Sequence, residues 1–175
     1  MKKNLLFSAT LLCSALLSST MFANQDSVST EADELQQGME LLSATYQATI
    51  KSYNKSDIEK CEVGMSSVIK AYMLSCAKNK SNAKNISSIE QEVTKTLEFL
   101  AATTNKNAAL ATTGLMFSIV FTRVMENVEA EVTDPKEIEN LSEAAEEISK
   151  FINKFFMEPM QELAAQQQAQ QPVAA

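Results

Sequence analysis

Two cysteines, Cys61 and Cys76, are the residues of this chain whose type and spacing most suggest chemistry. Cysteine pairs in exported proteins commonly form disulfides. Both lie on the apolar stripe of a helix predicted from Ser56 to Lys78, where a rise of about 1.5 Å per residue separates them by roughly 22 Å. A disulfide needs Cα atoms within about 7 Å. Three alternatives remain open: a disulfide after a helix break at Gly64, a disulfide between two chains, and two buried reduced thiols, which the stripe favours.

No catalytic group accompanies these cysteines. The sequence contains no histidine, so it cannot form a Ser-His-Asp or Cys-His nucleophile or an imidazole metal site. Its glycines, Gly38, Gly64 and Gly114, are too few and too far apart for a dinucleotide or phosphate-binding loop. Only Lys60, beside Cys61, is placed to favour a thiolate. We therefore expect no catalytic residue, no cofactor and no metal, and a protein that is not an enzyme.

Carboxylates form the second candidate site. They lie on the outer face of the last predicted helix and around the turn before it, at Glu139, Glu143, Glu146 and Glu147, and at Glu126, Glu129, Glu131, Asp134 and Glu137. Several carboxylates together would suit a divalent cation, but the alternating ligands and glycine of a calcium loop are absent. A carboxylate pair for glycoside cleavage is a further alternative, although the chain has no Trp to stack on a sugar. We interpret these residues as a solvated helix face and as favourable charge at a helix start.

An excess of apolar residues near the end of the last helix is the third candidate. Phe151, Phe155, Phe156 and Met157 widen the apolar stripe beyond what one core seam needs. They either dock another protein chain as a helix in a groove or cover the end of the bundle. Both interpretations stay open at this point.

The segment 110–128 is apolar almost all round and contains the only arginine, Arg123. We interpret the segment as a buried core helix, with a cavity for an apolar ligand as the alternative. For Arg123 we expect a side chain that reaches the surface over Glu126 and Asn127. The alternative is a buried anchor for a carboxylate ligand. The apolar run of about 14 residues, interrupted by Thr and Ser, is too short to predict a membrane span.

The elements that position these residues are helices, because apolar residues recur at three- and four-residue spacing. We predict helices from about Thr30 to Tyr53, over 56–78, from Ser87, over 108–131 and from Asp134, with N-caps at Ser56, Ser87, Asn107 and Asp134. A polar connector is expected over 78–85. Pro159 is expected to kink or end the last helix. The predicted fold class is all-α, a bundle of four to five amphipathic helices with a central apolar helix.

The first 23 residues have the pattern of a cleaved signal peptide. Lys2 and Lys3 precede an apolar stretch from Leu5 to Leu17, and Ala23 suits the residue before the cut. An uncleaved anchor and a lipid-modified Cys13 are weaker alternatives. The predicted organisation is a signal peptide over 1–23, a flexible mature N-terminus over 24–29, a helical bundle over 30–160 and a Gln/Ala-rich disordered tail over 161–175. We therefore expect a periplasmic or secreted protein.

Charge restricts the partners. The signal segment removes two of the 15 basic residues and none of the 22 acidic ones, which changes the net charge from −7 to −9. An acidic protein of this kind is a poor ligand for nucleic acid or for an anionic membrane surface. Lysines concentrate in the middle of the chain, over 51–106, and acids at both ends, so we expect the acidic arms to fold across the basic middle.

These observations favour a non-enzymatic exported protein that acts as a protein-binding, chaperone-like or inhibitor module. The expected partner is another protein, for which a basic one would be complementary in charge, or a second copy of the chain. The alternative function is a periplasmic carrier that holds an apolar ligand inside the bundle.

Overall fold

A computed structural model describes residue 40, residues 43–44 and residues 46–162. The predicted signal peptide over 1–23, the segment 24–29, most of the first predicted helix and nearly all of the predicted tail lie outside the described residues.

The described residues are helical and include no strand, which confirms the all-α fold class. The long helices are α3 (Lys55–Lys78), α4 (Ser87–Ala101), α5 (Lys106–Glu131) and α6 (Pro135–Ile152). Two 3₁₀ helices, η1 (Ile50–Ser52) and η2 (Lys80–Lys84), and one π-helix, η3 (Asn153–Met157), accompany them. Residues 46–49, before η1, are also helical.

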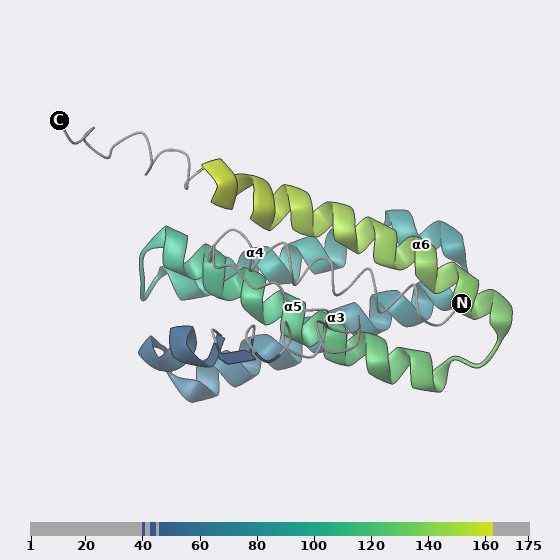
Figure 1. Ribbon diagram of the computed structural model, residues 1–175, viewed down its shortest axis with the longest axis horizontal. Helices are drawn as coiled ribbons and strands as arrows, with labels where there is room; N and C mark the ends of the chain where they lie inside the picture. The colour runs from purple at the N-terminus through teal and green to yellow at the C-terminus, as the bar shows by residue number, and fades with distance from the viewer. Residues whose placement is uncertain (1–39, 41–42, 45, 163–175) are drawn as a thin grey trace, which may run out of the picture.

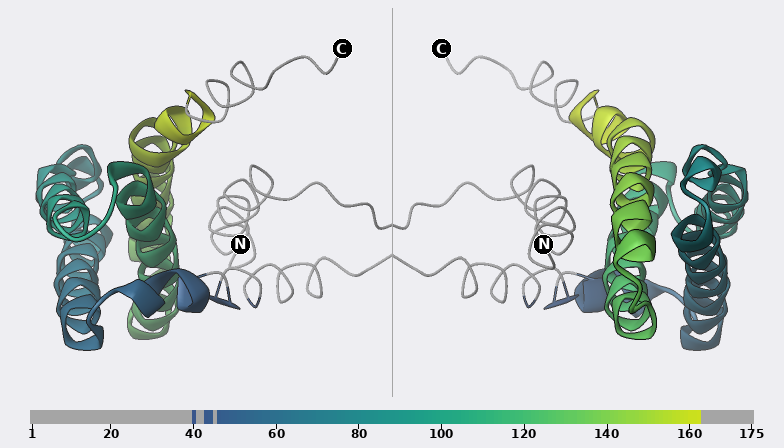
Figure 2. Two further views of the ribbon diagram at one scale, coloured as in Figure 1. Left: turned by 90° about the vertical axis from the view of Figure 1, so that its left-hand side faces the viewer. Right: turned by 90° about the vertical axis from the view of Figure 1, so that its right-hand side faces the viewer.

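The helices form a bundle in which α3 and α5 run in one direction and α4 and α6 in the other (Figure 1). Helix α3 contacts α4, α5 and α6, and α4 also packs on α5. Helix α6 lies on the side of the bundle opposite to α4 (Figure 2). The connector η2 packs on α6, and η3 contacts α5. Helices α3 and α5 therefore share a long seam, flanked by α4 on one side.

Helix α5 is the central apolar helix that the sequence predicts. Every residue from 116 to 122 is buried, because a helix without a polar face must be covered on all sides. Its buried hydroxyl groups donate to main-chain carbonyls four residues earlier at 2.7–3.0 Å, at Thr112, Thr113, Ser118 and Thr122. These hydroxyl groups are therefore hydrogen-bonded within α5 and need no partner on another helix.

The expectation that α5 falls short of a membrane span needs correction. An 18-residue window of α5 has a mean hydropathy of 1.5, and the helix is long and apolar enough to cross a membrane by length and composition alone. In the bundle 72% of that window is buried. A core helix that is covered by its neighbours has the same composition.

Two predicted N-caps are displaced toward the N-terminus. The cap of α3 is Asn54, whose side-chain oxygen accepts from the Ser56 amide at 2.9 Å, so Ser56 is not the cap. The cap of α5 is Asn105, which accepts from the Ala108 amide at 2.8 Å, so the predicted Asn107 lies inside the helix. Both asparagines have extended backbone dihedral angles, the conformation that an N-cap requires.

The remaining two caps have opposite outcomes. Asp134 caps α6 as predicted, because its carboxylate accepts from the Lys136 amide at 2.8 Å. Ser87 does not cap α4: the cap position is Ile86, and the Ser87 hydroxyl donates to Asn85 Oδ1 at 2.8 Å. The serine hydroxyl is thus used outside the helix, in the connector.

The helical segment that continues from α6 does not end at Pro159, since residues 158–162 are helical. The π-helix η3 lies directly before this proline, and the Glu158 amide donates to the Asn153 carbonyl five residues earlier. Proline has no amide hydrogen, and its ring clashes with the carbonyl four residues before it in an α-helix. The wider π-helical turn before Pro159 accommodates the proline within the helical segment.

Ion pairs join the basic middle of the chain to its C-terminal acidic arm. Lys70 on α3 pairs with Glu131 at the end of α5, and Lys80 on η2 pairs with Glu143 on α6 at 3.4 Å. These contacts are exposed and each stabilises the fold by at most about 1 kcal/mol. For the C-terminal arm they agree with the predicted folding of acidic residues across the lysine-rich middle.

Candidate functional site

A hollow on the surface between α3 and α5 is the candidate site. We name it the α3–α5 hollow; it is a shallow depression of about 380 Å³ including open solvent, and it is lined by Glu62, Val63, Ser66, Val120 and Arg123. Val63 is 69% exposed, whereas the other large apolar side chains of α3 are buried or half-buried. Val120, which is buried, is the apolar residue that α5 contributes to this hollow.

Helical spacing explains why these residues meet. Val63 and Ser66 are three residues apart on α3, and Val120 and Arg123 are three apart on α5, so each pair lies on one helix face. The two helices run side by side in the same direction, which brings the two faces to one seam (Figure 1). The result is an apolar contact area bordered by the charged side chain of Arg123.

Tyr46 links the N-terminal segment to this hollow. Its hydroxyl donates to Glu62 Oε1 at 2.9 Å, and its side chain is 2% exposed. Burial, followed by the nearby Glu62 carboxylate, raises the pKa of Tyr46 well above its ordinary value, and the positive charge of Arg123 acts in the opposite direction. Tyr46 therefore stays a neutral hydrogen-bond donor near neutral pH, and it holds the Glu62 carboxylate in place.

Arg123 is exposed, as its predicted extension to the surface requires, and it is not a buried anchor. None of the ion pairs among the described residues includes it. A guanidinium group can donate two parallel hydrogen bonds to one carboxylate. The hollow therefore presents one negative and one positive side chain, Glu62 and Arg123, beside a small aliphatic area.

The sequence did not point to Val63, Glu62 or Tyr46 as members of a site. The available signal was that Val63 lies off the apolar stripe of its helix, beside Cys61 and Met65 but not in line with them. A valine on a polar face is common in soluble proteins. Only the packing of α3 beside α5 places Val63 next to Val120 and Arg123.

The cysteines do not form a disulfide within the chain. Both are free thiols on the unbroken helix α3, which runs through Gly64, so the proposed break at this glycine is wrong. Cys76 is fully buried and Cys61 is half-buried. Burial raises the pKa of both thiols above the ordinary value, which disfavours the reactive thiolate. The described geometry therefore fits two core thiols, and a disulfide between two chains stays a prediction.

The apolar cluster proposed as a docking patch faces the interior of the bundle, which corrects that interpretation. Phe151, Phe156 and Met157 are buried, and Phe155 is half-buried against the rings of Phe151 and Phe156, with ring centres 5.1 and 5.0 Å away. Phe156 and Phe151 also contact Phe117 of α5. These side chains close one end of the bundle, the alternative that the sequence had left open.

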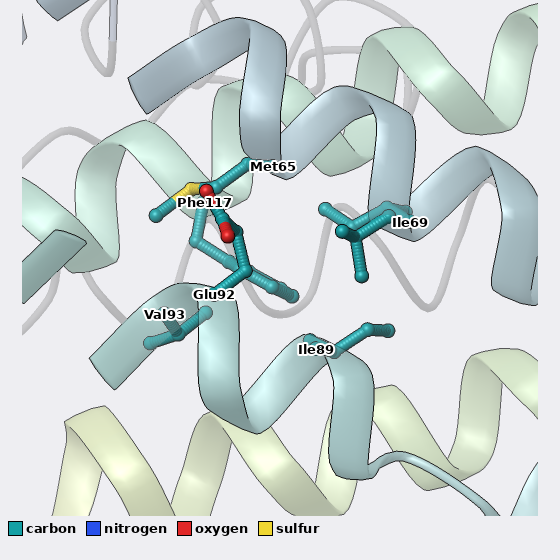
Figure 3. Close-up of a pocket in the computed structure, with 7 residues that line it drawn as sticks. Met65, Ile69, Ile89, Glu92, Val93 and Phe117 are labelled. Atoms are coloured by element: carbon teal, nitrogen blue, oxygen red, sulfur yellow. The ribbon is translucent and has the colours of Figure 1, made fainter. Parts of the chain in front are cut away.

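The interior beside Phe117 is tightly packed. A narrow space of about 130 Å³ lies between α3, α4 and α5 and has no room for a water molecule; its lining is Met65, Val68, Ile69, Ile89, Glu92, Val93 and Phe117 (Figure 3). The side chains that converge there are apolar except for Glu92, whose carboxylate points toward α3. An apolar ligand would have to separate these helices to bind at this position.

The carboxylates of α5 and α6 do not converge. Within the described ranges there is no group of three or more Cys, Asp or Glu side chains that could hold a metal ion. Several of these residues instead pair with lysines, as Glu146 and Glu147 do with Lys150 at 2.9 and 2.8 Å. This arrangement favours the interpretation as a solvated helix face.

Comparisons with protein-family models, with curated proteins and with solved structures found no match for this chain.

Proposed function

We propose that this protein is a non-catalytic protein-binding module and that the α3–α5 hollow is its contact site. The observation that carries the proposal is the position of Val63, a largely exposed branched side chain next to the exposed Arg123. Interfaces are enriched in arginine and in apolar residues at their centre. Val63 and Phe99 are the large apolar residues that stand out as exposed among the described residues, and of the two only Val63 borders a hollow that also contains a charged group.

The rest of the bundle is consistent with a binding role. The candidates for internal ligand binding and for docking through the phenylalanine cluster are occupied by the protein's own packing. The pattern of residues 1–23 supports export, and we include a periplasmic or secreted location in the proposal. A small helical bundle whose described surface hollows are shallow and open fits an adaptor, inhibitor or chaperone-like component better than an enzyme.

Site-specific photo-crosslinking tests this function. A photoreactive amino acid replaces Ser67, an exposed residue one helical turn after Val63, so that the residues of the hollow stay intact. The matched control carries the same amino acid at Ser142, an exposed serine on α6. Irradiation of living cells that produce and export the protein should give an adduct of defined mass at position 67 and not at position 142.

A second variant makes this result specific to the hollow. Val63→Asp places a charge in the apolar contact area and should lower the adduct yield at position 67 by about tenfold, because a desolvated charge weakens an apolar interface. Purified V63D should keep the melting temperature of the wild type, since Val63 is exposed. Equal adducts at both positions, or none at position 67, would contradict the proposed function.

A further inference from the structure

The π-helix η3 changes the helical register by one residue at the end of the bundle. We infer that η3 and residues 158–162 form a latch. In the π-helical register that the structure shows, residues 157–162 are held against the bundle, and a shift to the α-helical register releases them. Figure 1 shows this segment continuing the ribbon of α6. The inference concerns a conformational change and is independent of the α3–α5 hollow.

The first step is that burial after α6 is displaced by one residue. Ile148 and Ile152 are core residues of α6. The three- and four-residue spacing of an α-helix continues from them at Phe155 and Pro159. The residue that is fully buried is instead Phe156, and Phe155 is only half-buried.

The residues after η3 show the same displacement. Met157 is buried and Met160 packs partly against the core, whereas Glu158, Gln161 and Glu162 are exposed. Each residue of an α-helix adds a turn of about 100°, so one additional residue in η3 rotates the following segment by that angle. An unbroken α-helix would point both methionines away from the bundle and Glu162 toward it. The π turn therefore determines which face of residues 157–162 contacts the bundle.

The second step is that both registers supply the same core side chain. The ring of Phe156 contacts Phe117 and lies against Gly114, where a Cβ atom would be 3.2 Å from it. In the α-helical register the preceding residue, Phe155, would take this position. The core keeps a phenylalanine ring in either state. The cost of the shift therefore falls on residues 157–162, which lose their apolar contacts and detach because an unpaired carboxylate is not buried.

The third step is that Pro159 opposes the α-helical register. In an α-helix its ring would clash with the Phe155 carbonyl, and it has no amide hydrogen to donate to that carbonyl. In the observed register the Glu158 amide donates to the Asn153 carbonyl, five residues earlier. Pro159 therefore keeps the latch closed. A ligand that binds only the released segment would shift the population toward the open state.

Oxidation of the native methionines tests the release. Hydrogen peroxide converts accessible methionine to its sulfoxide, and peptide mass spectrometry gives the rate at each position. In purified Pro159→Ala protein, Met157 and Met160 should be oxidised at least about threefold faster than in the wild type, because the open state gains population. Pro135→Ala is the matched control, since it removes a proline from the first turn of α6 and should leave both rates unchanged. Met116, which is fully buried, provides the internal reference.

Two leucine substitutions distinguish a register shift from fraying of the helix end. In the wild type, Phe156→Leu should lower the denaturation midpoint more than Phe155→Leu, because Phe156 is fully buried and Phe155 is half-buried. In the Pro159→Ala background this order should reverse, because Phe155 then lies against Gly114. Leucine keeps each position apolar, so the variants should remain folded.

The two measurements decide the inference together. Faster oxidation of both methionines with a reversed order of the leucine variants supports the latch. Unchanged oxidation in Pro159→Ala overturns it. Faster oxidation with the wild-type order also overturns it, because the helix end then frays without a change of register.

Discussion

The carboxylate of Glu92 on α4 lies directly against Gly64 on α3, where a Cβ atom at position 64 would be 2.3 Å from Glu92 Oε1. Figure 3 shows Glu92 reaching across to α3 beside Met65. Glycine at this position therefore permits a close side-chain approach and is not a break in the helix. Helix α3 runs unbroken through this glycine between Cys61 and Cys76.

Gly64→Ala should stabilise the protein by about 0.5 kcal/mol. Alanine is favoured over glycine in a helix interior by about 1 kcal/mol, and the atom that it meets is the end of a flexible side chain. Chemical denaturation would measure the free energy of unfolding. In an Glu92→Ala background the same substitution should approach the full gain. A loss of stability with Gly64→Ala would mean that Glu92 is fixed by its surroundings.

Gly114→Ala should have the opposite sign and lower the free energy of unfolding by about 1 kcal/mol, since overpacking a core costs more than helix propensity gains. A Cβ atom at position 114 would lie 3.2 Å from the ring of Phe156. That ring is fully buried between Phe117, Phe151 and Phe155 and cannot move outward. The same denaturation series measures the effect. Equal gains in both alanine variants would contradict the tight contact with Phe156.

Helix type and order were predictable from sequence because local patterns determine them. The all-round apolar character of 110–128 is sufficient to predict a buried α5, and Asp134 with Pro135 marks the start of α6. The caps at Asn54 and Asn105 were missed because a serine or asparagine within two residues is an equally good acceptor. The choice between them depends on backbone dihedral angles that the sequence does not show.

The candidate site was less predictable because it depends on which helices pair. Val63 and Arg123 are 60 residues apart in sequence and meet only because α3 packs beside α5. The apolar cluster of Phe151, Phe155, Phe156 and Met157 has the composition of a docking patch. Only the packing of the helices shows that these side chains are covered at the end of the bundle. By contrast, the separation of Cys61 and Cys76 followed from helical rise alone.

Asn140→Ala should lower the free energy of unfolding by about 1–3 kcal/mol, because a buried carbonyl loses its donor. The Asn140 amide group donates to the Ala77 carbonyl at 2.7 Å in a buried contact between α6 and α3. Ala77 is in the last turn of α3, where carbonyls lack partners within the helix. Ser142→Ala, at an exposed position of the same helix, is the control and should change the stability little. A loss below about 0.5 kcal/mol would show that water replaces the donor.

Tyr72 should make folding sensitive to alkaline pH. Its hydroxyl donates to the Ala83 carbonyl at 2.8 Å, and burial raises its pKa above the ordinary value. The unfolded phenol ionises near pH 10 while the folded one stays protonated. The stability that Tyr72 contributes is therefore complete below about pH 10 and is lost as pH rises from there toward the raised pKa.

Comparison of Tyr72→Phe with the wild type measures this linkage. At pH 7 the variant should be less stable by about 1 kcal/mol, because the hydrogen bond is absent. Above about pH 10 the stability of the variant should fall less steeply with pH than that of the wild type. The two slopes should differ by at most about 1.4 kcal/mol per pH unit, so the two curves converge. Denaturation midpoints between neutral pH and pH 11 provide the measurement. Parallel curves would show that the phenol ionises equally in both states.

The two cysteines should differ in their reaction with an alkylating agent. Cys76 is fully buried, whereas Cys61 is half-buried, so the folded protein should be modified slowly at Cys61 and not at Cys76. Both should react after unfolding, and the raised pKa of each thiol should keep the native reaction slow near neutral pH. Intact mass without reduction, beside a non-reducing gel, reports both thiols and the cut expected after Ala23.

Cys61→Ser separates the remaining alternatives for these thiols. The folded variant should take up no alkyl group, because Cys76 lies within the core until α3 opens. Modification of Cys76 then reports the opening of the core. In a combined Cys61→Ser, Asn140→Ala variant its rate should increase about tenfold for each ~1.4 kcal/mol of stability that is lost. A wild-type mass that is lower by two hydrogens would contradict the continuous helix. A covalent dimer that disappears in Cys61→Ser would instead assign a disulfide between two chains to the half-buried thiol.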